Sequence, residues 1–333
     1  MTAVLPDSMH AVGLKGFGGS SVLHLVTVPC PRPKASQVLI KVAAAGLNRG
    51  DIIQRQGFYP PPPGASEILG LEVGGTIVAC GNNVQHFKIG DGVCALLPGG
   101  GYAEYCVADE AVVFPLPKGY SAQESAALPE AFMTVWTNLY DGAKLLRGET
   151  LLVHGGSSGI GTAAIALASA LGARVFATAG SDEKCKVCVE LGAERAVNYT
   201  KEDFVEAFKG ATLDKGVDVI LDMVGGDYVQ RNITLASARG RIVNIAFMKG
   251  HKVELNLLPV MLKRLTLTGS TLRARPLAEK GAIAKAVMAN VWPLLDNGRI
   301  KPVIDRIFPL GEVAEAHRRM EESAHIGKIL LAP

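Results

Sequence analysis

A glycine-rich turn between an apolar segment and a long apolar helix is the part of this sequence best suited to chemistry. Residues 150–154 predict a buried strand, Gly155-Gly156-Ser157-Ser158-Gly159-Ile160-Gly161 a tight turn, and residues 162–171 a helix with few polar side chains. In this arrangement the backbone amides of the turn and the helix N-terminus face a bound phosphate. The pattern predicts a dinucleotide site. An ordinary strand-to-helix turn is the alternative, because glycines occur in any tight turn.

The residues after the next predicted strand indicate which dinucleotide this site takes. An NAD-specific fold places an acidic side chain about 20 residues after the glycines, where it binds the ribose hydroxyls. Here the strand 174–178 ends in Ala179-Gly180-Ser181, without a carboxylate, and the acidic residues 182 and 183 fit the first turn of the following helix. Lys184 and the Ser181 hydroxyl could both donate to a phosphate. NADPH is therefore favoured over NADH, although base rates alone favour a solvated helix lysine at position 184.

Two patterns of secondary structure surround these residues. Residues 10–119 contain short strand-like segments separated by glycine and proline, which predicts a largely antiparallel β domain. The clearest of these strands are 38–42, 74–78, 92–96 and 102–107. Residues 121–140 then have helical periodicity.

From residue 150 onward strands and helices alternate, which predicts a parallel sheet with helices on both faces. The predicted strands are 151–154, 174–178, 196–199, 217–223, 241–246 and 265–269. The predicted helices between them are 160–171, 182–191, 202–209 and 227–236. One helix over 277–297 follows, and then a strand, helix and strand over 303–308, 310–321 and 328–331 that return to the first domain.

Composition limits the classes of function. The chain has 333 residues, 48% of them hydrophobic, so it can form two domains with sizeable cores. Its formal net charge of +3 comes without basic blocks, which argues against nucleic acid or a membrane surface as the main partner. No apolar run is long enough to span a membrane and residues 1–7 lack the features of a signal peptide, so we expect a cytoplasmic protein. The six cysteines fit reduced thiols, and the spacing of Cys185 and Cys188 fits chance better than a metal or redox site.

Several motifs together resemble one known family. They are Gly46-Leu-Asn48-Arg49-Gly-Asp51, Gln54-Arg-Gln-Gly-Phe-Tyr59, Gly64-Ala-Ser-Glu-Ile-Leu-Gly70-Leu-Glu72, Leu97-Pro-Gly-Gly-Gly101-Tyr, Gly159-Ile-Gly161, Thr178-Ala-Gly-Ser181 and Gly327-Lys328. From about residue 9 to 331 the chain resembles the zinc-independent quinone oxidoreductase branch of the medium-chain dehydrogenase/reductase superfamily, and most of all its p53-inducible quinone oxidoreductase-like proteins. This resemblance implies a GroES-like domain over 1–128 and 271–333, and a Rossmann domain with a doubly wound parallel sheet over 129–270.

The resemblance also implies that zinc is absent. Zinc-dependent members of the superfamily carry a cysteine where this chain has Asn48 and a histidine where it has Leu71. Leucine cannot bind a metal and asparagine is a poor zinc ligand. The region 94–106 also lacks the four closely spaced cysteines of the structural zinc lobe. Asp51 and Glu72 are then expected to make structural hydrogen bonds, with a direct chemical role as the alternative.

Further site residues follow from the same resemblance. It implies that Asn48 lies beside the nicotinamide or the substrate and that Tyr59 forms an aromatic wall or hydroxyl donor over a quinone, although Tyr59 could also simply pack on the prolines that follow it. The residues expected to contact the cofactor are Asn48, Thr134, Gly156, Ser157, Ser158, Gly159, Ile160, Gly161, Gly180, Ser181, Lys184, Tyr199, Phe247, Leu272, Arg273 and Lys328. Core packing is the alternative for Phe247 and Leu272. His154, at the end of the first strand of the parallel sheet, fits a packed residue better than a catalytic base.

The function that these expectations describe is NADPH-dependent reduction of a quinone by direct transfer of hydride or electrons, without a metal. A quinone accepts hydride directly, so such an enzyme chiefly needs to position cofactor and acceptor. One alternative is an enal, enone or enoyl-thioester reductase, and another is a non-enzymatic crystallin-like or RNA-binding protein. The apolar strand 265–269 is expected to lie at the sheet edge and to pair with a second copy in a homodimer.

Overall fold

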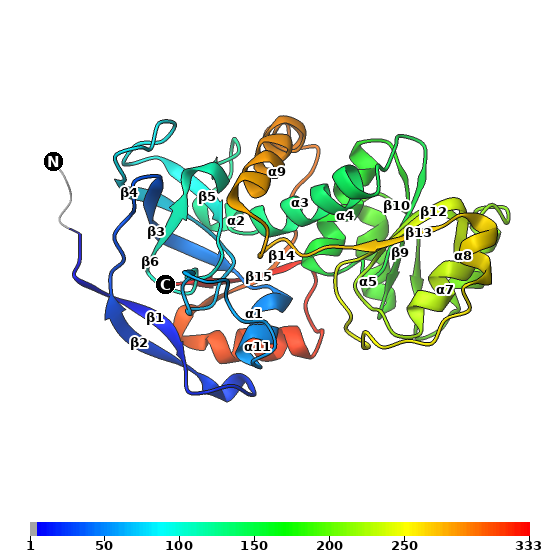
Figure 1. Ribbon diagram of the computed structural model, residues 1–333, viewed down its shortest axis with the longest axis horizontal. Coiled ribbons are helices and arrows are strands. Elements are labelled where there is room, and N and C mark those ends of the chain that lie inside the picture. The colour runs from blue at the N-terminus through cyan, green and yellow to red at the C-terminus, as the bar shows by residue number, and fades with distance from the viewer. Residues whose placement is uncertain (1–4) are drawn as a thin grey trace. The chain divides into compact units, whose positions relative to one another are not determined.

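The computed structural model describes residues 5–333, and the chain forms two compact units (Figure 1). The first unit comprises Met1–Met133, Leu272–Asn297 and Pro302–Pro333, and the second comprises Thr134–Thr271 and Gly298–Lys301. Residues 1–4, part of the segment 1–7 considered above, lie outside the described residues. Within residues 5–333 there is no helix with the length and apolar character needed to cross a membrane.

The first unit is built on a seven-stranded sheet. Its order is β14-β15-β3-β4-β5-β7, with β6 paired to β3, and all pairs except β14 with β15 are antiparallel. The strands are β3 (Gln37–Gly46), β4 (Glu72–Cys80), β5 (Gly92–Leu96), β6 (Tyr105–Asp109), β7 (Val113–Pro115), β14 (Ile304–Pro309) and β15 (Lys328–Ala332), with a separate hairpin of β1 (Ser8–Leu14) and β2 (Leu23–Pro29). This sheet confirms the largely antiparallel GroES-like domain. Because β15 pairs with β3, the end of the chain completes this unit, as the sequence predicted.

The helices of the first unit connect and cover these strands. They are α1 (Arg49–Arg55), α2 (Ala122–Ser125), the start of α3 (Pro129–Val135), α9 (Leu277–Asn290), α10 (Trp292–Asp296) and α11 (Val313–Glu321). The core contains aliphatic residues from several strands, including Val38 and Ile40 of β3, Val73 of β4 and Ile329 of β15, all with 0% exposure. This packing fixes the ends of α1, β4 and β15, which carry the polar residues described below.

The second unit is a six-stranded parallel sheet in the order β10-β9-β8-β11-β12-β13. Its strands are β8 (Thr150–Val153), β9 (Arg174–Ala179), β10 (Ala193–Asn198), β11 (Val217–Asp222), β12 (Ala236–Asn244) and β13 (Thr266–Gly269). Its helices are α4 (Gly159–Ala170), α5 (Asp182–Glu190), α6 (Phe204–Ala211), α7 (Tyr228–Leu235) and α8 (Leu258–Lys263). The strand order runs outward in both directions from β8 and β11, so right-handed crossovers place helices on both faces. The doubly wound Rossmann sheet is therefore confirmed, and β13 is at its edge.

Several predicted elements differ from the structure. The strand predicted over 241–246 runs instead over Ala236–Asn244, so it begins directly after α7. The helix over 277–297 is broken into α9 and α10, because Pro293 has no amide hydrogen for the bond that a continuous helix needs there. The helical region 121–140 is divided into α2, α3 and a π-helical turn over Trp136–Gly142, with Pro129 at the start of α3. The strand predicted over 102–107 begins only at Tyr105. Tyr102 lies before it and uses its hydroxyl elsewhere, as described below.

Candidate functional site

The glycine-rich turn of the second unit has the geometry of a phosphate-binding turn. Gly155 follows β8 with a φ of 66°, which favours glycine, and a Cβ added to Gly161 would overlap the backbone of Gly155 and Gly156. Ser158 caps α4, since its Oγ accepts a hydrogen bond from Gly161 N at 3.0 Å. The first amides of a helix have no acceptor within the helix, so those of Gly159 and Ile160 suit an anionic ligand.

The end of β9 brings together three of the residues that the sequence assigned to an adenosine phosphate. Ser181 caps α5, because its Oγ accepts from Lys184 N at 3.2 Å. A Cβ on Gly180 would lie 2.7 Å from the Tyr199 hydroxyl, so that hydroxyl lies directly beside Gly180. Gly180, Ser181 and Tyr199 therefore form one small group, and Tyr199 remains 48% exposed.

Asp182 is the acidic residue that directly follows Ser181, and its carboxylate has other partners. Asp182 begins α5, as expected, and accepts from Asn198 Nδ2 at 2.7 Å and from Lys201 Nζ at 2.5 Å. The hydrogen bonds from Asn198 and then Lys201 hold the pKa of the Asp182 carboxyl below its ordinary value. The paired Lys201 offsets the negative charge that would otherwise repel a phosphate at the end of β9.

His154 is a packed residue, as the sequence favoured. Its ring has no exposed surface; its Nε2 donates a hydrogen bond to Asn232 Oδ1 at 2.7 Å, and in the neutral ring Nδ1 accepts one from the Thr178 hydroxyl at 2.9 Å. The ring also makes edge contacts with Phe204 and Tyr228. Burial lowers the pKa of His154, so the ring is held neutral under the sheet rather than presented to a ligand.

The other residues expected near the cofactor occupy different environments. Phe247 follows β12 and is 47% exposed, so core packing is the wrong explanation for it. Leu272 is 6% exposed and is compatible with core packing. Thr134 lies in α3 and its carbonyl accepts from Asn138 Nδ2 at 2.8 Å.

In the first unit a buried ionic network joins Asn48, Glu72 and Lys328. The Lys328 ammonium donates to Asn48 Oδ1 at 2.7 Å, to Leu47 O at 3.1 Å and to Glu72 Oε1 at 2.5 Å. Asn48 Nδ2 donates to Glu72 Oε1 at 2.9 Å and to Gly46 O at 3.2 Å. All three hydrogens of the ammonium and both amide hydrogens of Asn48 thus have protein acceptors. Through its hydrogen bonds to both side chains, Asn48 holds Lys328 and Glu72 in place.

Asp51 lies beneath this network and anchors the start of α1. Its carboxylate accepts from Asn48 N at 2.8 Å, Gly70 N at 3.0 Å and the Tyr102 hydroxyl at 3.1 Å. Burial raises the pKa of Asp51 to about 6, although these hydrogen bonds oppose the rise. The expected structural hydrogen bonding is confirmed for both Asp51 and Glu72. The ion pair between Glu72 and Lys328 was not foreseen, because nothing in the sequence links positions so far apart.

Tyr59 follows α1 in the chain, and its ring packs back against Gly50 at the N-terminal end of that helix, next to the same network. A Cβ on Gly50 would lie 3.1 Å from Leu71 Cδ1 and 3.4 Å from Tyr59 Cε1, so both side chains pack over this glycine. The Arg273 guanidinium is 5.1 Å from the centre of the Tyr59 ring and donates to Pro98 O, Tyr59 O and Gln54 Oε1. The bond to Tyr59 O ties Arg273 to the backbone of the Tyr59 loop, and the guanidinium lies against the Tyr59 ring. Within residues 5–333 the Tyr59 hydroxyl has no hydrogen-bond partner.

Glu130 is a further polar residue here that the sequence analysis missed. It lies in the first turn of α3, and its backbone amide donates to Glu72 Oε2 at 2.9 Å. Burial, followed by the charge of Glu72, raises the pKa of the Glu130 carboxyl to about 8. A single glutamate after a proline gives no sequence signal for such an environment. Among the described residues no group of three or more histidine, cysteine or acidic side chains is arranged to hold a metal.

A parallel Rossmann sheet of the dinucleotide-binding type and a GroES-like unit in one chain define the class of two-domain dehydrogenases and reductases. A family model described as "Alcohol dehydrogenase GroES-like domain" matches residues 34–118, and one described as "Zinc-binding dehydrogenase" matches residues 159–288. The quinone oxidoreductase of Rattus norvegicus is 34% identical over 326 residues, which cover 97% of each chain.

Solved structures agree with this class. The Escherichia coli quinone oxidoreductase complexed with NADPH has a TM-score of 0.87 at 27% identity, with 97% of this chain and 100% of that chain covered. The CurK enoyl reductase has a TM-score of 0.84 at 28% identity, with 98% and 99% covered. The chain belongs to the quinone oxidoreductase branch of the medium-chain dehydrogenase/reductase superfamily and is an oxidoreductase of that superfamily.

Proposed function

We propose that the protein is an NADPH-dependent quinone oxidoreductase in which hydride passes to the quinone without help from a metal ion. The observation that carries this proposal is the Lys328 ammonium, which binds Asn48 Oδ1 and Glu72 Oε1. Zinc-dependent relatives have a cysteine in place of Asn48 and a histidine in place of Leu71. In this protein the Lys328 ammonium is fixed between Asn48 and Glu72, and no zinc ion is expected there. The acceptor should therefore be one that takes hydride without a Lewis acid, as a quinone does.

The second unit fits NADPH as the hydride source. The glycine-rich turn suits the diphosphate, and Gly180, Ser181, Lys184 and Tyr199 suit the adenosine 2'-phosphate. The carboxylate of Asp182 is paired with Lys201 and does not oppose this phosphate. A bound NADPH supplies a hydride from its nicotinamide ring.

The cofactor proposal is tested by calorimetric titration of NADPH and NADH. Ser181→Ala and Lys184→Ala should each weaken NADPH binding while leaving NADH binding nearly unchanged, since only NADPH carries the 2'-phosphate. Asp141→Asn, at an exposed position distant in sequence from this group, serves as the control and should change neither. Equal losses for both cofactors in the Ser181 and Lys184 variants would contradict the assignment of the phosphate site.

The first unit supplies a surface for a flat acceptor. The Tyr59 ring is held by Arg273 on one side, and its unpartnered hydroxyl can donate a hydrogen bond to a quinone oxygen. The fixed charge of Lys328 lies in the same network and favours negative charge that develops on the acceptor. Because Lys328 has no free hydrogen, it acts through its charge and through the position it gives to Asn48.

Enoyl-thioester reduction is the second candidate, favoured by the structural likeness to the CurK enoyl reductase. It uses the same hydride but protonates a carbon next to the carbonyl group. NADPH oxidation should be followed with 1,2-naphthoquinone, crotonyl-CoA and a 2-alkenal under identical conditions. We expect the quinone to have the highest kcat/KM, and preference for an enoyl substrate would overturn the proposal. Tight RNA binding by a protein that fails to bind NADPH would remove the enzyme proposal altogether.

We also propose that two copies pair through β13. This edge strand bonds to β12 on one side, and all four of its residues are exposed. The neighbouring α8 has no buried residue, and its Met261 and Leu262 are each 67% exposed. An open strand beside exposed apolar side chains is usually covered by a partner, and a second copy would cover both.

A further inference from the structure

Reduction of a quinone by hydride requires a proton as well. Once hydride has been accepted, one oxygen carries negative charge until it is protonated. The hydrogens of Lys328 and of the Asn48 amide all have protein acceptors, so the ionic network has none to give. Burial raises the pKa of the Tyr59 phenol above its ordinary value, which makes it a hydrogen-bond donor that gives up its proton reluctantly.

Glu130 lies beside the network of Asn48, Glu72 and Lys328, and its carboxyl group has no hydrogen-bond partner among the described residues. Its backbone amide is tied to Glu72 Oε2 at 2.9 Å, which fixes the first turn of α3 against the network. Its carboxyl takes part in no hydrogen bond or ion pair with residues 5–333, although the side chain is half-buried. Carboxyl groups in such positions usually have partners, and this one keeps access to water.

The charges around Glu130 favour its protonated form. Burial and the carboxylates of Glu72 and Asp51 raise the pKa of Glu130 to about 8, while Lys328 and Arg273 lower it by less. Lys280 of α9 and the Tyr59 phenol also lie within electrostatic reach. The charged and titratable groups that face Glu130 are therefore Glu72 from β4, Asp51 from α1, Lys328 from β15, Arg273 and Lys280 from the start of α9 and the loop before it, and Tyr59 from the loop after α1. At neutral pH the carboxyl holds a proton that it can transfer.

We propose that Glu130 is the acid that protonates the reduced quinone, an inference that rests on the proposed function. Hydride adds to the quinone, and an electron pair moves onto a quinone oxygen. That oxygen takes the proton of the Glu130 carboxyl as its O–H bond breaks, and the resulting carboxylate regains a proton from water. In sum, quinone, NADPH and one proton give hydroquinone and NADP⁺. An enoyl acceptor would need this proton on carbon instead.

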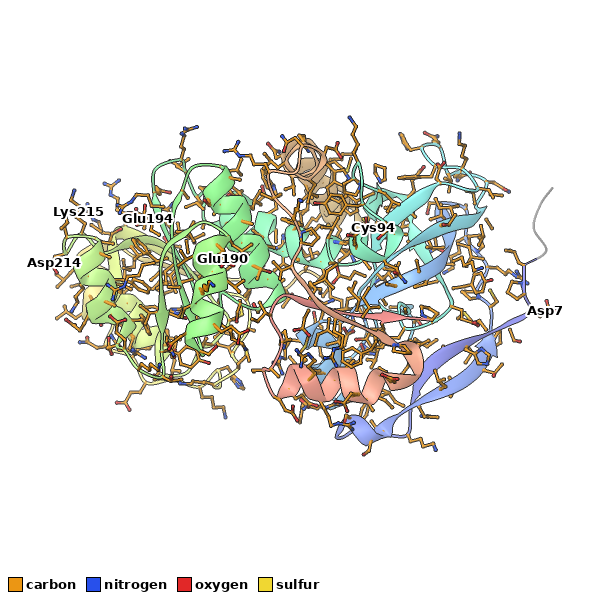
Figure 2. All side chains as sticks on the ribbon, turned by 180° about the vertical axis from the view of Figure 1, so that it is seen from behind. Asp7, Cys94, Glu190, Glu194, Asp214 and Lys215 are labelled. Atoms are coloured by element: carbon orange, nitrogen blue, oxygen red, sulfur yellow. The ribbon has the colours of Figure 1, made fainter. Side chains whose placement is uncertain are left out.

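Single-turnover oxidation of NADPH by 1,2-naphthoquinone from pH 6 to 9.5 tests this role. In the parent protein the rate should fall about tenfold per pH unit above pH 8, as the carboxyl loses its proton. Glu130→Gln should lower the rate at pH 7 by about 100-fold and remove this decline. Glu130→Asp should restore part of the rate together with the decline. Glu190→Gln, at an exposed carboxylate of α5 labelled in Figure 2, should behave like the parent.

The outcomes separate this inference from the function on which it rests. Unchanged NADPH affinity in Glu130→Gln, measured by calorimetry, would show that a lower rate does not come from loss of the fold. A parent protein that reduces quinones while Glu130→Gln keeps its rate and its pH decline would overturn the role of Glu130 alone. If Glu130→Gln oxidised NADPH slowly but its rate still fell above pH 8, the role of Glu130 would also be overturned. A parent protein that reduces no quinone would overturn the proposed function, and this inference with it.

Discussion

Lys328→Met should destabilise the first unit strongly, because it leaves the Glu72 carboxylate buried without a cation. Glu72 has no exposed surface, and the lost ammonium makes hydrogen bonds of 2.5, 2.7 and 3.1 Å to Glu72, Asn48 and Leu47. Removing one partner of a buried ion pair costs about 3 to 5 kcal/mol, and methionine keeps most of the packing volume. We therefore expect the free energy of unfolding to fall by about 4 kcal/mol.

A double-mutant cycle isolates the ionic part of this loss. Replacing both partners removes the stranded charge, so Glu72→Gln/Lys328→Met should cost less than the sum of the two single variants by about 2 kcal/mol or more. Arg318→Met provides the control, since its pair with Glu315 is exposed on α11 of the same unit, and it should change stability by less than about 0.5 kcal/mol.

The assay is urea unfolding followed by tryptophan fluorescence. The chain has two tryptophans, Trp136 in the second unit and Trp292 in the first, so a Trp136→Phe background reports the first unit alone. Trp292 stacks on Phe114 at 4.7 Å, and its emission should change when this unit unfolds. A loss of less than about 1 kcal/mol in Lys328→Met, or additive single variants, would refute the role given to the buried pair.

Three further predictions concern the glycine-rich turn, an acid-sensitive core residue and the sheet edge. Gly161→Ala places a Cβ against the backbone of Gly155, and the strain of about 1 to 3 kcal/mol should weaken NADPH binding by tenfold or more in calorimetry; an unchanged Kd would contradict this. Burial lowers the pKa of His317 from 6.5 to about 3, so the stability it contributes above pH 6.5 is lost as the pH falls below that value. In urea unfolding, the free energy of unfolding should fall by about 2 kcal/mol less from pH 7 to pH 5 in His317→Phe than in the parent protein. An equal fall in the two proteins would show that His317 is not the cause. Leu267→Lys puts a charge on the exposed edge strand β13 and should shift sedimentation from dimer to monomer, whereas an unchanged dimer would exclude this edge as the interface.

Local patterns in the sequence predicted most of the fold. The alternation of strands and helices after residue 150 follows from periodicity and glycine placement, which are local properties, and the parallel sheet was therefore predicted. The prediction of one helix over 277–297 is wrong, because the apolar periodicity continues past Pro293 whereas a proline interrupts a helix whatever its apolar pattern. Tyr102 was assigned to a strand because its bond to Asp51, a residue distant in the chain, has no local signal.

The candidate site could be predicted only in part, for the same reason. Ser181 and Gly180 follow a strand directly, so their place at the end of β9 could be read from the sequence. The ion pair of Lys328 with Glu72 joins two strands far apart in the chain, and only the folded first unit brings them together. The pKa of Glu130 is raised by burial and then by the carboxylates of Glu72 and Asp51, which belong to other elements of the fold. Such a property belongs to the packed structure and has no counterpart in sequence spacing.

The central claim, reduction of quinones by NADPH without a metal, is tested most directly by one steady-state comparison. Protein dialysed against EDTA is assayed with NADPH or NADH as donor and with 1,2-naphthoquinone or crotonyl-CoA as acceptor. We expect full activity after dialysis, with the highest kcat/KM for NADPH and the quinone. Loss of activity that zinc restores, or a higher kcat/KM for crotonyl-CoA, would contradict the account.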